Sequence, residues 1–455
     1  MENGEMSISD AIDSNSEWQS WEKDNFKIYQ SGMHEEGNYI RVYAPKQLPS
    51  SSVKAVVYLH GFALCTPKFY EAHLEELVNQ GYIVFFPDYQ HSTYPEDDSC
   101  PPESEKLISL IDWFKIAFRS KKRLIEQKKS KQALRGGRLI YRFTQGRIIR
   151  TAIALFLAVR VAYLFYFFIS PEYANNLARI ISTVDWSLAF SPKDWVRMAI
   201  ARTEFGWEKL CQDYPELDTK QLDFYTFGHS LGGLLALSWS TYLSPEQQKF
   251  QPKQIITADP APKSNMGIPG FITPFLKLLG SPSVVDAISI KETGKNIKVP
   301  VAIFHGVDDK IVKPKQWVKP SLFGDKPLFD YIYSNRKKIY FSESNFKKHL
   351  TANHNQAVTD TYFGKIFFKG FGGVKEQPNA YNYEFIWSGL DSVIKGEAEA
   401  DKLLGKFPLK EIQITESLPE KLSVVSKIPQ VAFASIAIFG LGYLLWQLVT
   451  TYVIT

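Results

Sequence analysis

Short apolar runs that end in polar or turn-forming residues recur along the chain, and stretches of helical pattern separate several of them. The runs, in chain order, are KAVVYLHGF, GYIVFFPDYQH, LDFYTFGHS, KQIITADPAP, VPVAIFHGVDD and KKIYFSES. Near-continuous apolar runs of this length are typical of strands buried on both faces. Helical patterns lie near 70–80, at 195–214 and from Leu231 onward. This alternation predicts an α/β fold with a mainly parallel sheet, flanking helices and right-handed crossovers.

Two shorter segments precede these runs, at 26–29 and 39–43, and turn-forming glycines lie between them. They predict a hairpin at the edge of the sheet. Residues 1–24 are polar and acidic, and we expect them to form a disordered lead-in. They lack the basic and apolar regions of a secretory signal, so we expect the folded domain on the cytoplasmic side.

The connection between the second and third runs is much longer than a crossover needs. From Asp88 to Ser230 there are 142 positions, whereas a crossover takes a dozen or more residues and usually contains one helix. We therefore expect one α/β domain made of residues 25–100 and 191–406, interrupted by a helical insertion at 101–190. A linker at 407–427 would follow it.

The insertion carries a concentration of positive charge. Twelve Lys or Arg residues and one acid lie between Arg119 and Arg150, although the whole chain has a net charge of only +5. An apolar run follows at 148–169, with Arg160 near its middle. One membrane crossing here would put strands of the same sheet on opposite sides of the bilayer. We expect residues 119–169 to contact an anionic membrane surface, as an interfacial or re-entrant helix, and to cover the active site as a lid.

Two other interpretations of the basic insertion stay open, a lid without membrane contact and a solvated basic face. Nucleic acid is not expected as a partner, because the basic run contains no recognisable reader motif.

Residues 428–455 form an uncharged stretch of 28 positions. As a helix it would be about 42 Å long, more than the roughly 30 Å of a bilayer's hydrocarbon core. Trp446 and Tyr452 suit a membrane interface, and Lys421 and Lys427 precede the stretch. We expect a single-pass C-terminal transmembrane anchor, with a buried helix as the alternative.

The cysteines are few, namely Cys65, Cys100 and Cys211, and no CxxC pattern or Cys/His cluster is present. The sequence therefore predicts neither a disulfide framework nor a metal site, which suits a reducing compartment.

The segment Gly228-His229-Ser230-Leu231-Gly232 has the pattern G-x-S-x-G between an apolar run and the helical stretch LLALSWSTYL. In such a strand-to-helix turn the serine hydroxyl is exposed, and side chains in place of the glycines would collide with neighbouring elements. The helix N-terminus also favours a developing oxyanion. Ser230 is therefore predicted to be a nucleophile.

An earlier run ends in His60-Gly61-Phe62. An oxyanion hole needs one N–H donor after the nucleophile and one from a loop of this kind. We expect the N–H groups of Leu231 and Phe62 to fill these two positions.

A serine nucleophile needs a base, and the base needs an acid that holds it in the correct tautomer. The acid follows the nucleophile in chain order and the histidine comes last. Asp308 and Asp309 in HGVDDKIV, and Asp259 after QIITA, are the candidate acids. The histidines after the last run are His349 and His354, and we favour His354 because His349 follows two lysines.

Residues 53–92 and 220–360 resemble the α/β-hydrolase superfamily, in its lipase and esterase branch. HGVDDKIV is similar to that family's H-G-x-x-D-x-x-V turn, which selects Asp309 as the acid. Asp259 stays as the rival, because some lipase relatives take the acid from the earlier strand. The resemblance implies ester hydrolysis through an acyl-enzyme by a catalytic triad, with no metal or organic cofactor.

The sequence thus predicts a membrane-anchored serine hydrolase of lipid metabolism that cleaves a lipophilic carboxylic ester. Two alternatives stay open: an acyltransferase that uses the same triad with an alcohol acceptor, and a non-catalytic membrane scaffold with this fold.

Overall fold

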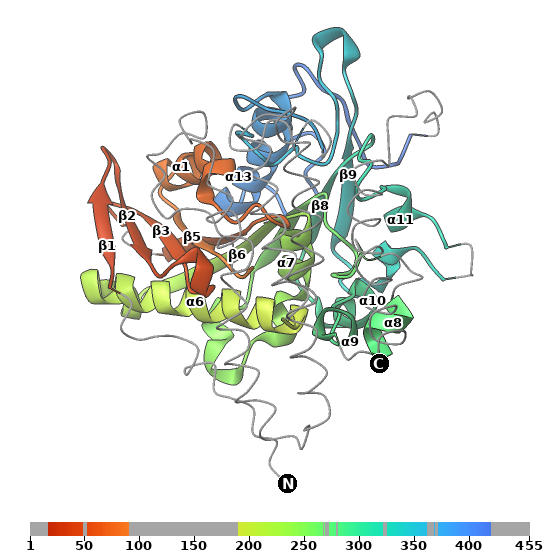
Figure 1. The fold of residues 1–455 in the computed structure, drawn as a ribbon. Helices are drawn as coiled ribbons and strands as arrows, with labels where there is room; N and C mark the ends of the chain where they lie inside the picture. The colour runs from red at the N-terminus through yellow and green to blue at the C-terminus, as the bar shows by residue number, and fades with distance from the viewer. Residues whose placement is uncertain are drawn as a thin grey trace, which may run out of the picture. The chain divides into compact units, whose positions relative to one another are not determined.

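Ten strands form one sheet at the centre of the described chain (Figure 1). The structure, a computed structural model, describes residues 17–48, 52–90, 190–266, 268, 273–278, 281–321, 325–361, 368 and 372–419. All of these residues fall within one compact unit, Met1–Cys100 together with Thr183–Glu420.

The strands are β1 (Gln19–Glu22), β2 (Phe26–Ser31), β3 (Ile40–Pro45), β4 (Ser52–Leu59), β5 (Ile83–Pro87), β6 (Gln221–His229), β7 (Gln254–Ala258), β8 (Val301–Gly306), β9 (Lys337–Ser342) and β10 (Ile414–Thr415). Their order across the sheet is β1-β2-β3-β5-β4-β6-β7-β8-β9-β10. The pairs from β5 to β9 are parallel, whereas β1, β2 and β3 at one edge and β10 at the other pair antiparallel. The predicted mainly parallel sheet and the hairpin of β2 and β3 are confirmed.

The central strands form from apolar runs, because their side chains are buried on both faces of the sheet. Every residue of β5 and β8 is buried, as are the last five of β4. Such strands lose nearly all contact with water when helices cover both faces of a parallel sheet. This is why these runs show no alternation of apolar and polar residues.

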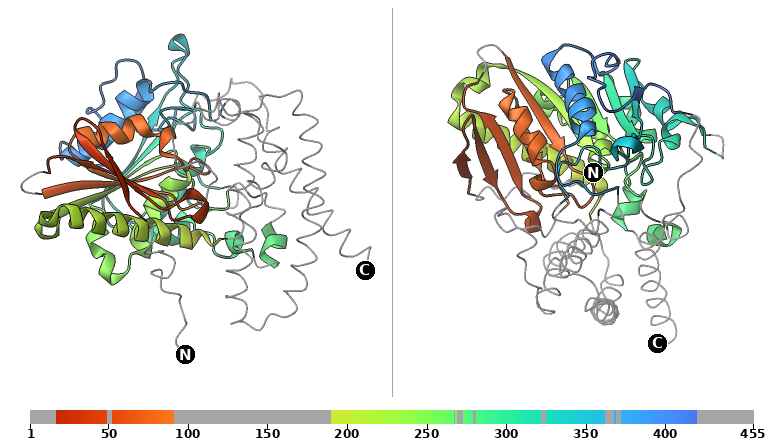
Figure 2. Two further views of the ribbon diagram at one scale, coloured as in Figure 1. Left: turned by 60° about the vertical axis from the view of Figure 1, so that its left-hand side comes forward. Right: turned by 90° about the horizontal axis from the view of Figure 1, so that it is seen from above.

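The α-helices are α1 (Glu71–Asn79), α6 (Pro192–Asp213), α7 (Leu231–Tyr242), α8 (Thr273–Leu278), α9 (Pro282–Val285), α10 (Ile290–Thr293), α11 (Lys315–Val318) and α13 (Ser388–Lys395). Shorter 3-10 helices lie at η2 (His34–Glu36), η3 (Pro67–Phe69), η5 (Pro215–Thr219), η6 (Pro245–Phe250), η7 (Gly294–Asn296), η8 (Leu328–Tyr331) and η9 (Phe346–Lys348), and η11 (Tyr381–Trp387) is a π-helix that leads into α13. Helices α1 and α13 cover one face of the sheet, and α6, which packs beside α7, covers the other (Figures 1 and 2).

The register brings the ends of the parallel strands to one edge of the sheet. Leu59 of β4 lies opposite Gly228 of β6, and His229 lies opposite Ala258 of β7. Ligands of open α/β sheets bind beyond the carboxyl ends of the strands. The loops after β4, β6, β7 and β8 therefore emerge together, where chemistry on such a sheet is expected.

Two boundaries predicted from the sequence are wrong. Strand β1 lies inside the predicted disordered lead-in 1–24, because its backbone pairs with β2 although its own side chains are all exposed. The predicted linker 407–427 is folded into the domain as far as it is described. Strand β10 adds to the edge at β9, and the buried Glu384 carboxylate accepts hydrogen bonds from the N–H groups of Lys410 and Glu411.

The predicted helical insertion (residues 101–189 of it) and the predicted anchor at 428–455 lie outside the described residues. Among the helices that the structure does describe, none is long and apolar enough to cross a bilayer.

Candidate active site

Ser230 occupies a sharp turn between β6 and α7. Its backbone has φ 55° and ψ −116°, a conformation that non-glycine residues rarely adopt. A side chain on Gly228 would place its Cβ 2.2 Å from the carbonyl oxygen of Gly232, and one on Gly232 would lie 2.2 Å from the carbonyl oxygen of Leu59. The two glycines are required because the turn packs directly against backbone. The strained turn is held by hydrogen bonds from Ser230 N–H to Ala258 O and from Ala261 N–H to Ser230 O, each 2.9 Å long.

Three side chains from separate loops meet at this turn. The His354 Nε2 atom lies 2.7 Å from Ser230 Oγ, and its Nδ1 atom lies 2.7 Å from Asp309 Oδ2. All three residues are buried, and Ser230, at 9% exposure, is the most accessible of them. Ser230 follows β6, Asp309 follows β8 and His354 follows β9. The structure thus brings together the three residues named from the sequence.

The hydrogen bonds define which nitrogen of His354 carries the proton. An ionised carboxylate can only accept, so Nδ1–H donates to Asp309 and Nε2 is left to accept from the serine hydroxyl. Burial alone would lower the pKa of His354, but the charge of Asp309, its hydrogen bond and the more distant charge of Asp259 together raise it above the usual 6.5. This is the tautomer and the basicity that a general base needs.

Asp309 is itself held in place by backbone. Its Oδ1 atom accepts hydrogen bonds from the N–H groups of Ile311 (2.8 Å) and Val312 (2.9 Å), which leaves Oδ2 for His354. Its neighbour Asp308 accepts a hydrogen bond from the Ser344 hydroxyl instead. The two adjacent carboxylates therefore have different partners, and the one that meets His354 is Asp309, which the family resemblance selects.

The rival acid, Asp259, has other partners. Its Oδ1 atom accepts from the Gly306 N–H at 2.8 Å and lies 3.2 Å from His305 Nδ1, and both of its oxygens are within 3.4 Å of the Gln356 side-chain nitrogen. No hydrogen bond or ion pair of the described residues joins Asp259 to the His354 ring. His349, the rival base, is exposed at the end of η9 and adopts a left-handed conformation. Neither rival takes part in the hydrogen-bonded triad.

A serine on a sharp strand-to-helix turn, a carboxylate after a later strand and a histidine after the next one, all on a mainly parallel sheet, define a known architecture. The described chain has the α/β-hydrolase fold. The six parallel strands and the order Ser-Asp-His along the chain are both part of that pattern.

Comparison with known proteins finds matches at low identity among solved structures. No protein-family model matches the sequence, and no match to a curated protein is found. Solved structures of similar fold include acetyl xylan esterase 1 from Thermoanaerobacterium sp. JW/SL YS485, with 13% identity and a TM-score of 0.36, over 79% of this chain and 88% of that one. A monoacylglycerol lipase from Paleococcus ferrophilus has 14% identity and a TM-score of 0.31, over 67% and 88%. Est1E from Butyrivibrio proteoclasticus has 11% identity and a TM-score of 0.33, over 74% and 90%.

Several hydrogen bonds anchor the loop after β4 of this hydrolase fold. The Gly61 carbonyl accepts from His60 Nδ1 (2.9 Å) and from the Leu64 N–H (3.0 Å), and the Ala63 N–H donates to Gln90 Oε1 (2.9 Å). No hydrogen bond among the described residues uses the N–H of Phe62, and none uses that of Leu231. These are the two N–H groups predicted from the sequence to form an oxyanion hole.

The loop that carries His354 is clamped from the π-helix side. The carbonyl oxygens of Gln356 and Val358 accept from Lys375 Nζ (2.8 and 3.1 Å) and from Asn382 Nδ2 (2.9 and 3.3 Å). Lys375 is buried, and burial lowers its pKa to about 7, although the charge of Asp259 opposes that shift. No local sequence motif identifies Lys375 or Asn382, because their hydrogen bonds to the His354 loop depend on a contact between distant segments.

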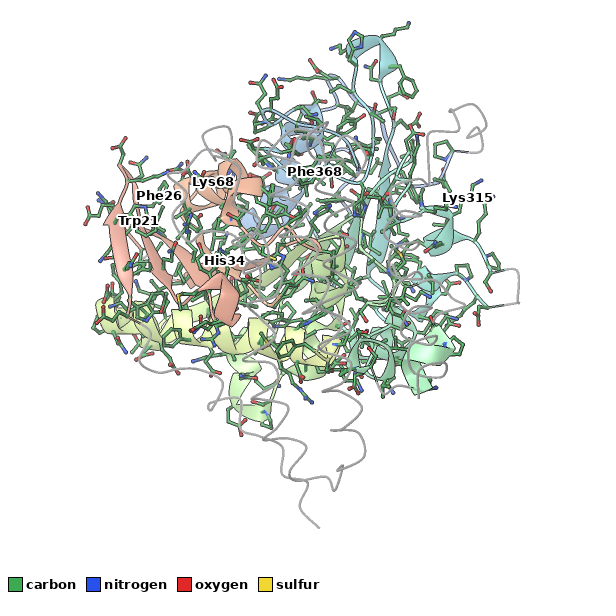
Figure 3. The ribbon with its side chains drawn as sticks, in the orientation of Figure 1. Trp21, Phe26, His34, Lys68, Lys315 and Phe368 are labelled. Atoms are coloured by element: carbon green, nitrogen blue, oxygen red, sulfur yellow. The ribbon has the colours of Figure 1, made fainter. Side chains whose placement is uncertain are left out.

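Two buried groups of side chains bring three potential metal ligands within 4.8 Å of one another: His60, Cys65 and Asp88, and Asp259, His305 and Asp309. In each group, hydrogen bonds already occupy the carboxylates. Asp88 accepts from His34 Nδ1 (2.7 Å) and from the Gln90 N–H (2.8 Å), and His34 is labelled in Figure 3. We therefore interpret both groups as supports for the loops rather than as metal sites.

Proposed function

We propose that this protein is a serine hydrolase that cleaves a carboxylic ester through an acyl-enzyme. The observation that carries the proposal is the chain of two 2.7 Å contacts from Ser230 Oγ through His354 to Asp309. A serine hydroxyl is a weak nucleophile until a base removes its proton, and this geometry supplies the base in its reactive tautomer.

In the proposed reaction Ser230 Oγ attacks the ester carbonyl carbon while its proton passes to His354 Nε2. The negative oxygen of the tetrahedral intermediate would accept hydrogen bonds from the N–H groups of Phe62 and Leu231, at the N-terminus of α7. His354 then gives its proton to the leaving alcohol as the acyl-enzyme forms. A water molecule, deprotonated by the same nitrogen, releases the acid and restores Ser230.

The test is covalent labelling with a fluorophosphonate probe, which reacts with activated serines. The wild type should be labelled and Ser230→Ala should not. Ser238→Ala is a matched control, because Ser238 is a buried serine of α7, the helix that follows Ser230, and its hydroxyl bonds to that of Thr293 at 3.0 Å. An unlabelled wild type, or equal labelling of Ser230→Ala, would contradict the proposal.

The choice between water and an alcohol as acceptor is tested on products. With a labelled acyl donor and an added alcohol, hydrolysis should give free acid alone. A new ester as the main product would show an acyltransferase instead.

We further propose that the substrate is lipophilic and reaches the site from a membrane. The support is in the sequence: twelve basic residues between Arg119 and Arg150, an apolar run at 148–169, and 28 uncharged positions at 428–455. The basic segment suits anionic headgroups and the last stretch suits a bilayer crossing.

This part is tested by floating the full chain with lipid vesicles, with and without about a third of anionic lipid. We expect the chain without residues 428–455 to lose carbonate-resistant attachment and to keep binding to anionic vesicles only. Release of the full chain by carbonate would contradict the anchor. Equal binding of the truncated chain to neutral and to anionic vesicles would contradict the electrostatic contact.

A further inference from the structure

Three buried hydrogen bonds join the segments that form the proposed site. The Gly61 N–H donates to Tyr70 Oη at 2.9 Å, Tyr70 Oη lies 2.9 Å from His229 Nδ1, and His229 Nε2 lies 2.8 Å from the carbonyl oxygen of His354. The side chains of Tyr70 and His229 are completely buried. Tyr70 directly precedes α1, and its hydroxyl makes no hydrogen bond to a triad side chain among the described residues.

The direction of each bond follows from the groups at the two ends. The Gly61 N–H can only donate and the His354 carbonyl can only accept. His229 therefore carries its proton on Nε2, and its Nδ1 accepts the hydroxyl proton of Tyr70. Burial, with the nearby His354, lowers the pKa of His229 to about 3, so the ring stays neutral and can act as donor and acceptor at once.

These three hydrogen bonds, the relay, adjoin the proposed reacting groups at three points. Gly61 precedes Phe62, whose N–H is a proposed oxyanion donor, and His229 precedes the nucleophile Ser230. The third partner is the backbone of His354, the proposed base. A Cβ on Gly61 would lie only 2.9 Å from His229 Nδ1, so the loop after β4 also packs directly on the ring. Tyr70 and His229 thus connect the loop of the proposed oxyanion donor, the turn that carries the nucleophile and the backbone of the base.

We propose that Tyr70 and His229 are positioning residues, which set the distance between the oxyanion donor at Phe62, Ser230 and His354 without touching the substrate. This inference rests on the proposed hydrolase function. Catalytic geometry is sensitive to displacements of about 1 Å, which can cost about 100-fold in rate. Removing the Tyr70 hydroxyl would leave the Gly61 N–H and His229 Nδ1 without partners inside the protein.

The same core holds a matched control. Tyr58 Oη lies 3.1 Å from His73 Nδ1, both residues are completely buried, and the Tyr58 ring centroid is 5.2 Å from that of Tyr70. Burial also lowers the pKa of His73 to about 3. Among the described residues, the side-chain hydrogen bond of this pair reaches none of the three reacting segments. Tyr58→Phe therefore removes the same kind of bond at a site that should not affect catalysis.

The experiment compares Tyr70→Phe and Tyr58→Phe in the full chain, on an ester that the wild type hydrolyses. For Tyr70→Phe we expect kcat to fall about 10- to 100-fold with KM changed less than about threefold. For Tyr58→Phe we expect kcat within about twofold of wild type, at a similar loss of thermal stability. Equal kcat values for the two variants would overturn the inference, because a purely structural role would affect both alike.

Amide hydrogen exchange tests the relay without any need for activity. In Tyr70→Phe, peptides that contain Gly61 and His354 should exchange faster than in the wild type, and in Tyr58→Phe they should not. Unchanged exchange at both places would overturn the inference whatever the enzyme does. An unlabelled wild type with altered exchange would instead refute the proposed hydrolase and leave the relay standing.

Discussion

Two buried histidine–aspartate pairs with the same nitrogen–oxygen distance lie at the carboxyl ends of the parallel strands. His354 Nδ1 is 2.7 Å from Asp309 Oδ2, and His34 Nδ1 is 2.7 Å from Asp88 Oδ2. Asp88 follows β5 and Asp309 follows β8. The pairs differ at the second ring nitrogen. Nε2 of His354 faces the Ser230 hydroxyl at 2.7 Å, whereas Nε2 of His34 is buried without a hydrogen-bond partner in the described chain.

In the proposed mechanism, a carboxylate–imidazole bond does not by itself make a base. At His354 the carboxylate fixes a tautomer whose free nitrogen meets a hydroxyl beside a turn that is slightly open to solvent. At His34 the same bond, together with stacking on Tyr39 at 3.7 Å, ties a loop to the end of a strand. Substitutions at the two pairs should separate the proposed reactive pair from the structural one.

The largest effect is expected from Asp309→Asn. An asparagine can donate to Nδ1 and so favour the wrong tautomer, which should lower kcat by about 10³- to 10⁴-fold. His34→Gln is the counterpart in the other pair and should keep kcat within about threefold. Single-turnover kinetics on correctly folded protein measure both. Comparable losses in the two variants would contradict the division of roles.

The next effect is on stability, at the structural pair. Burial alone would raise the pKa of Asp88, but hydrogen bonds from His34 and His60 hold it well below the usual 3.8. Asp88→Asn removes one partner of a buried pair and should cost about 3–5 kcal/mol of unfolding free energy at pH 7.

The sign of the pH dependence follows from the lowered pKa of Asp88. A carboxylate of this kind stabilises the fold above its unfolded pKa and loses that contribution as the pH falls through the folded value. The gap between wild type and Asp88→Asn should therefore narrow below about pH 3.8. Denaturant titrations at several pH values measure it, and a gap that widens toward acid would be the contrary result.

A smaller effect concerns the pH profile of the reaction. His354 acts as a base only when neutral, and its pKa is raised above 6.5 by Asp309. Below that raised pKa, kcat/KM should fall about tenfold per pH unit. Asp309→Asn should move this limb to lower pH, because the charge that raises the pKa is gone, while His34→Gln should leave it in place. A limb that moves only in His34→Gln would refute the assignment of the base.

A last effect concerns stability at the clamp on the His354 loop. The pKa of Lys375 is lowered from 10.5 to about 7, so the unfolded chain binds one more proton between these values and stability should rise with pH across that window. In Lys375→Met the slope of unfolding free energy against pH should be smaller by an amount that corresponds to up to one bound proton. Parallel stability curves for wild type and variant from pH 7 to 10 would contradict the buried, weakly basic lysine.

Much of the sheet could be predicted because its strands are buried on both faces and so appear as uninterrupted apolar runs. Strand β1 could not, since all four of its side chains are exposed and only its backbone pairing with β2 orders it. The sequence predicts a linker at 407–427 for a similar reason. Its place in the domain depends on the carboxylate of Glu384 and on two residues of β10, and neither leaves a periodic pattern.

The sequence by itself determined the order and nature of the parallel strands and the glycines of the nucleophile turn. It also narrowed the reacting groups to one serine, one favoured aspartate and one favoured histidine. These are local properties, since hydrophobic period and backbone conformation are set by neighbouring residues. Only the tertiary structure decided which carboxylate meets the imidazole, and that Tyr70, His229 and Lys375 hold the reacting loops. Those contacts join residues far apart along the chain. Burial strengthens the contacts and alters the pKa values of the residues that make them.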